Sequence, residues 1–131
     1  MPTPQVPVSW GELLDKLTIL EIKQERIACP AARANVDREY RSLRIVGSQA
    51  LSMAGMPALY QRLKRVNEEL WEIEDAIRDE EAKARFEAEF IGLARSVYRM
   101  NDRRAAIKRE INQLLESELV EEKSYAAFAH S

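Results

Sequence analysis

The sequence contains little glycine, proline or cysteine, and it has no long apolar run. Only nine of the 131 residues are glycine or proline, about 7% of the chain, against roughly 12% in average proteins. β-Sandwiches, β-barrels and glycine-rich phosphate loops need such turn residues at regular intervals. Their scarcity excludes these architectures and predicts one all-α domain.

Cys29 is the single cysteine and His130 the single histidine. One cysteine forms no intrachain disulfide, which is typical of the reducing cytoplasm. Catalytic schemes built on a serine or cysteine nucleophile need a positioned base, and a histidine in the terminal tail does not provide one. No segment approaches the roughly 20 apolar residues of a membrane helix, and the N-terminus has no signal-peptide pattern. We expect a cytoplasmic protein that does not bind membranes.

The charges nearly cancel, with 20 lysines and arginines against 22 aspartates and glutamates. This balance makes nucleic-acid binding an unlikely function. Walker loops, G-x-G-x-x-G and C-x-x-C motifs are missing, so phosphate-loop, dinucleotide and zinc-ribbon sites are excluded. Glu69 and Glu72 resemble half of the magnesium motif of all-α nucleotide pyrophosphohydrolases, but the facing E-x-x-D motif is absent. We therefore predict no metal site and no cofactor.

Apolar spacing predicts four helices. Ser9 and Glu12 form a capping-box pattern that starts the first helix, which runs to Cys29, and Pro30 starts a second helix that ends near Val46. Residues 47–56 hold two glycines and are expected to form a loop, after which Pro57 restarts the helix. The next two apolar stripes, 59–77 and 86–114, are out of phase across 78–85. A hairpin turn is expected there, with one continuous helix as the alternative.

This pattern gives a four-helix bundle or helical hairpin in which the two long helices are antiparallel. Residues 1–8 carry three prolines and are expected to form an extended arm. Residues 9–118 form the helical domain. Residues 119–131 are expected to form a C-terminal tail.

Several polar side chains lie within or beside the apolar stripes. An unpaired charge in a core costs several kcal/mol, so these side chains are expected to pair in an internal polar layer. In this layer Arg104 and Lys108 meet carboxylates of Glu21 or Glu74, and two asparagines bridge them. The layer is interpreted either as a device that sets helix register or as a cleft for a small anionic ligand. Its members are Glu21, Asn67, Glu74, Asn101, Arg104 and Lys108.

The first helix carries apolar residues on a second face, away from its main apolar arc. Apolar residues on two sides indicate that a helix is covered on two sides. With so few helices in the chain, we predict that a second subunit provides this cover in a homodimer. The candidate interface residues are Glu12, Asp15, Lys16, Ile19, Ile22 and Lys23.

Five sequence blocks carry a resemblance to a known family. They are residues 8–23 (VSWGELLDKLTILEIK), 66–78 (VNEELWEIEDAIR), 90–98 (FIGLARSVY), 101–112 (NDRRAAIKREIN) and 117–125 (SELVEEKSY). Together they resemble a family of small bacterial and phage proteins catalogued as a domain of unknown function. The resemblance implies a cytoplasmic α-helical protein, and it brings no catalytic residues to carry across.

The leading functional hypothesis is a homodimeric interaction or scaffolding protein that binds a protein partner on a helical face. It is not assigned as an enzyme, and its catalytic residues are unknown. The alternative is a small enzyme or sensor that holds an anionic metabolite in the polar layer.

Overall fold

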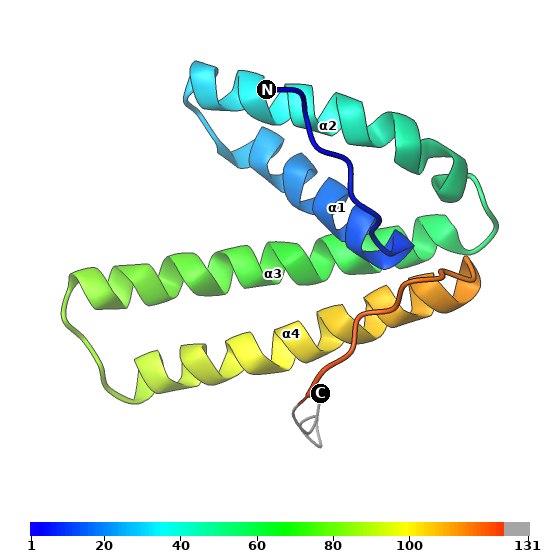
Figure 1. Ribbon diagram of the computed structural model, residues 1–131. Helices are drawn as coiled ribbons and strands as arrows, with labels where there is room; N and C mark the ends of the chain where they lie inside the picture. Colours follow the sequence, from blue (N-terminus) through cyan, green and yellow to red (C-terminus); the bar gives the residue numbers. More distant parts are fainter. Residues whose placement is uncertain (125–131) are drawn as a thin grey trace.

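The computed structural model describes residues 1–124 and contains four helices. These are α1 (Trp10–Arg26), α2 (Pro30–Leu51), α3 (Met56–Ala82) and α4 (Ala88–Leu114). The prediction of an all-α bundle is confirmed, and the part of the chain that is described contains no strand. Figure 1 shows α3 and α4 as a long antiparallel hairpin, with α1 crossing it and α2 lying beside α1.

The first helix starts where the capping pattern predicts, although only half of the capping box forms. The hydroxyl oxygen of Ser9 accepts a hydrogen bond from the Glu12 backbone N–H at 3.1 Å. The Glu12 carboxylate does not return to the backbone, because it accepts a hydrogen bond from Lys108 instead. α1 ends at Arg26, three residues before the predicted end at Cys29. Pro30 begins α2 as expected.

The predicted loop over 47–56 is wrong in its first half, because α2 continues through Gly47 to Leu51. Gly47 lies against α1, where an added Cβ would stand 2.6 Å from a methyl carbon of Leu17. This glycine permits close packing of two helices and does not end one. The loop is confined to residues 52–55, where Gly55 has a φ of 86°.

The chain turns between α3 and α4 as predicted, but later than expected, since α3 extends to Ala82. Ala84 takes the left-handed conformation (φ 53°) that glycine commonly occupies at a helix end. The N–H of Arg85 donates to the Glu80 carbonyl at 2.9 Å, and that of Ala84 to the Glu81 carbonyl at 3.0 Å. This Schellman pattern stops α3 without the glycine or proline that would mark a turn in the sequence.

The hydrophobic core lies where α1 crosses the hairpin. The buried residues of α3 all fall within Met56–Leu70, and those of α4 within Met100–Asn112. Phe86, placed by its spacing in the second of the two apolar stripes, lies in the turn before α4 and is 53% exposed. The core comprises Leu14, Leu17, Met56, Leu59, Tyr60, Leu63, Val66, Leu70, Met100, Ile107 and Ile111.

Candidate functional site

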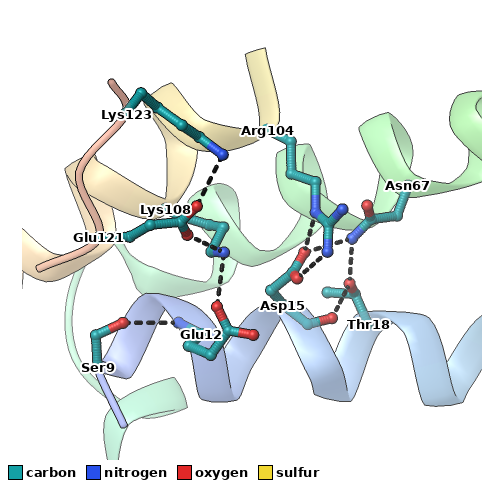
Figure 2. A network of polar contacts seen from close by, with 9 residues as sticks. All are labelled: Ser9, Glu12, Asp15, Thr18, Asn67, Arg104, Lys108, Glu121 and Lys123. Carbon is teal, nitrogen blue, oxygen red and sulfur yellow. Dashed lines mark hydrogen bonds and ion pairs between the residues drawn. The ribbon is translucent and has the colours of Figure 1, made fainter. Parts of the chain in front are cut away.

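A polar network fills the crossing between α1, α3 and α4 (Figure 2). At its centre the side chain of Asp15 is only 2% exposed. Arg104 donates from Nε to one carboxylate oxygen of Asp15 at 2.9 Å and from a terminal nitrogen to the other. This two-point ion pair raises the pKa of Arg104 above its ordinary value. The buried carboxylate is therefore matched by a guanidinium that remains charged.

Asn67 joins α3 to the same carboxylate. Its amide nitrogen donates to Asp15 Oδ1 at 2.9 Å and to Thr18 Oγ1 at 2.8 Å, and Thr18 donates to the Asp15 backbone carbonyl at 2.7 Å. Thr18 is fully buried and Asn67 nearly so. Since an amide nitrogen has two hydrogens to donate, both are used. Asn67 therefore bridges α3 to Asp15 and Thr18 of α1, and not to the predicted carboxylates of Glu21 or Glu74.

Lys108 forms the second part of the network, one helical turn along α4. Its side chain is 8% exposed, and its Nζ lies 2.8 Å from a Glu12 carboxylate oxygen and 2.6 Å from one of Glu121. Burial lowers the pKa of Lys108, but the hydrogen bonds to these two carboxylates outweigh it and raise the pKa above its usual value. Hydrogen bonds from Lys108 and Lys123 lower the pKa of Glu121 to about 2.

The segment that carries Glu121 returns along α4 after a sharp turn. Glu116 adopts a φ of 52°, and the Ser117 N–H donates to the Asn112 carbonyl at 2.8 Å. The Trp10 N–H donates to the Ser117 hydroxyl at 3.3 Å, which ties this turn to the start of α1. The residues beyond 124, including His130 and the end of the predicted tail, lie outside the described part of the chain.

The polar layer forms where the sequence predicts it, but with other carboxylates. The predicted pairing of Arg104 and Lys108 with Glu21 or Glu74 is wrong, because Asp15 and Glu12 take these places. Glu21 instead accepts hydrogen bonds from Tyr60 and Lys64. Burial and the contact with Glu21 raise the pKa of Tyr60. Glu74 is exposed on α3, beyond the crossing.

Beside the network lies a hollow of about 260 Å³ that opens to solvent. Asn101, Arg104 and Lys108 of α4 line this hollow together with the C-terminal segment. Arg104 and Lys108 each also contact a carboxylate of the same chain. The lining residues are Glu12, Asn101, Arg104, Ala105, Lys108, Glu121 and Lys123.

The second face of α1 is covered by α2 of the same chain. Lys16 forms an ion pair with Glu39 of α2 at 3.0 Å, and Gln24 donates to Asp37 of α2 at 3.0 Å. Ile22 is 1% exposed, so it is not available to a second subunit. The argument that this face requires another subunit is therefore wrong. Asp15 is likewise buried and Glu12 pairs with Lys108, whereas Lys16 is exposed and Ile19 and Lys23 are partly exposed.

Sequence reasoning missed Thr18, Gly11, Asn112 and Glu121 as members of this region. The Asn112 carboxamide oxygen accepts a hydrogen bond from the Gly11 N–H at 2.7 Å. An added Cβ on Gly11 would lie 2.6 Å from the Lys108 carbonyl oxygen, so α1 and α4 touch through their backbones. A glycine within the first turn of a well-capped helix was the available signal for this contact.

A comparison with protein-family models places the whole of this architecture within one family. The model described as "Family of unknown function (DUF6165)" matches residues 4–130, which include all four helices. The chain belongs to this family. No match was found among curated proteins or among solved structures.

Within residues 1–124, no helix is both long enough and apolar enough to cross a membrane. Over the same range, no group of three or more histidine, cysteine, aspartate or glutamate side chains is arranged to hold a metal ion.

Proposed function

We propose that this DUF6165 protein is a non-enzymatic helical interaction module that acts as a homodimer and presents a helical face to a protein partner. The observation that carries this proposal is the uneven burial of the α3–α4 hairpin. Both helices bury side chains only in the half that α1 crosses. The remainder, residues 71–99, is here called the distal hairpin. An isolated helical pair is marginal in water without further packing, so this segment is suited to association.

The pairing within the polar layer also supports this function. Arg104 and Lys108 are each matched by carboxylates of the same chain. A buried, fully paired network specifies how elements pack, and this one holds α1 against both helices of the hairpin. In this role the layer orients the interaction module and needs no ligand.

The molar mass of the protein in solution tests the proposal. Sedimentation velocity over a wide concentration range is expected to give the mass of two chains at micromolar concentration and above. A single-chain mass at every concentration would contradict the homodimer. Crosslinking in the host cell, followed by mass spectrometry, would then identify the protein partner.

The second candidate is a sensor or small enzyme that binds an anionic metabolite in the hollow beside Lys108. The observation in its favour is that Arg104, Lys108 and Asn101 all line this open space. Native mass spectrometry of protein purified from its host tests it. A stoichiometric small anion that is lost in Lys108→Met would favour this candidate over the scaffold.

A bacterial or phage origin and a cytoplasmic location belong to the same proposal. The location is supported by Cys29, a single exposed thiol that forms no disulfide. Nucleic acid is not proposed as a partner, since several basic residues of α4 have acidic neighbours within the chain. Arg109 lies 3.6 Å from Glu122, and Arg104 contacts Asp15.

A further inference from the structure

The distal hairpin holds four of the nine aromatic residues of the chain, and none of the four is buried. Phe86 and Tyr98 are more than half exposed, and Trp71 and Phe90 are partly exposed. The rings of Phe86 and Phe90 pack edge to face, with centroids 5.3 Å apart. Aromatic side chains bury the most area when they are covered, so this exposed group marks a surface that gains from a partner.

Helical spacing identifies the face to which these residues belong. At about 100° per residue, Glu74 and Arg78 continue the line of Asn67 along α3. On α4, Phe90 and Ala94 continue the line of Asn101 in the same way. Because Asn67 bonds to α1, this is the face that α1 covers at the crossing and leaves uncovered further along the hairpin (Figure 1). We call it the distal face.

The charges on the distal face are self-complementary. Glu74 and Arg78 stand one turn apart on α3, and within residues 1–124 neither takes part in a hydrogen bond or ion pair. An antiparallel second copy would bring Glu74 against Arg78 of the partner subunit. By symmetry it would also bring Arg78 against Glu74 of the partner subunit. A parallel copy in register would place like charges together, which costs stability. The order of charges therefore selects an antiparallel copy of the same chain.

The residues of α4 fit the same symmetry. Phe90, Ala94 and Tyr98 follow one another at one-turn intervals, with the smallest side chain in the middle. Two antiparallel copies of α4 that cross at Ala94 can approach closely there. Phe90 then meets Tyr98 of the partner subunit on both sides of the crossing. The Arg62–Glu110 ion pair sets the register of the hairpin, and in this register residue 94 of α4 lies beside residue 78 of α3. The midpoint between Glu74 and Arg78 is about 3 Å from residue 78 along α3, so one slightly tilted two-fold axis serves both helix pairs.

We propose that the distal faces of two copies pack together as an antiparallel four-helix bundle about a two-fold axis that passes between Glu74 and Arg78 on α3 and near Ala94 on α4. This inference rests on the proposed homodimer and names its interface. The 12 residues that each helix contributes, 71–82 and 88–99, span roughly 18 Å at 1.5 Å per residue. An isologous interface of this kind is closed, so the assembly stops at two chains.

Charge reversal tests the reciprocal pairing. Glu74→Arg alone places arginine against arginine twice in the dimer, and Arg78→Glu alone places glutamate against glutamate twice. Each variant is expected to dimerise at least tenfold more weakly than the unchanged protein. An equimolar mixture restores both attractive pairs, so native mass spectrometry should show dimers that contain one chain of each variant. This recovery also shows that both variants fold.

Glu69→Arg is the matched control, since it makes the same change of charge on the opposite, exposed side of α3. It should leave dimerisation unchanged. Dimers that persist in both single variants would overturn the distal interface but leave the homodimer intact. Failure of the mixture to form mixed dimers would overturn the antiparallel pairing. A monomeric unchanged protein would overturn the proposed homodimer, and a foreign helical partner bound to the distal face would replace the second copy.

Discussion

Asp15 and Arg104 are separated by 89 positions in the chain, and they meet as a two-point ion pair between α1 and α4. The carboxylate is almost fully buried, whereas the arginine side chain retains 29% exposure. This asymmetry means that the aspartate depends on the arginine more than the reverse. The pair also fixes the angle at which α1 crosses the hairpin, because a bidentate contact tolerates little rotation.

Replacing Arg104 by methionine is expected to destabilise the fold. The change leaves a buried carboxylate without its counter-charge, and breaking one side of a buried pair costs about 3–5 kcal/mol. Urea unfolding followed by circular dichroism measures the loss. The double variant Asp15→Leu with Arg104→Met should regain much of it, because apolar residues often replace a buried pair at little cost. Equal stability of Arg104→Met and the unchanged protein would show that this pair does not orient α1.

The sequence predicts which residues of a helix face the core better than it predicts which residues they contact there. Helical periodicity places Asn67, Arg104 and Lys108 inside, and the structure agrees. Which carboxylates they meet depends on the angle and depth at which α1 crosses the hairpin, and periodicity does not contain this information. Asp15 and Glu12 were therefore assigned to an outer face of their helix, although they supply the counter-charges.

The ends of the helices show a related limit. Ser9 and Pro30 mark helix starts by local chemistry, and both starts were predicted correctly. Gly47 was interpreted as a helix end, but its role is set by the close approach of Leu17, which lies 30 positions away in the sequence. Ala84 ends α3 in the left-handed conformation, which an alanine in the sequence does not predict. The sequence predicts a helix end where a local hydrogen bond makes it, as at Ser9. Where a contact with a distant residue decides whether the helix continues, as at Gly47, the local sequence does not show it.

Stability at low pH is expected to report the contact between Lys108 and Glu121. The pKa of Glu121 falls from an ordinary value of 4.5 to about 2 in the folded chain. A lowered carboxyl pKa contributes stability above the unfolded value, and this contribution disappears as the pH falls through the folded value. The gap in unfolding free energy between the unchanged protein and Glu121→Gln should therefore be full above pH 4.5 and shrink toward pH 2.

Urea unfolding of both proteins across this range measures the gap, and the other carboxylates cancel in the comparison. Glu122→Gln is the matched control, because Glu122 is 78% exposed and lies 3.6 Å from Arg109. It should differ little from the unchanged protein at any pH. A gap for Glu121→Gln that stays constant between pH 4.5 and 2 would contradict the ion pair.

Two glycine-to-alanine changes test the backbone contact between α1 and α4. At Gly11 the new methyl group would stand 2.6 Å from the Lys108 carbonyl oxygen, and at Gly92 nothing lies within 4 Å. Both residues are helical, so alanine is intrinsically favoured at each by roughly 0.5–1 kcal/mol. Gly92→Ala should therefore raise the unfolding free energy. Gly11→Ala should lower it by about 1–3 kcal/mol, because overpacking outweighs helix propensity. A stabilised Gly11→Ala variant in urea unfolding would show that α1 and α4 do not meet through their backbones.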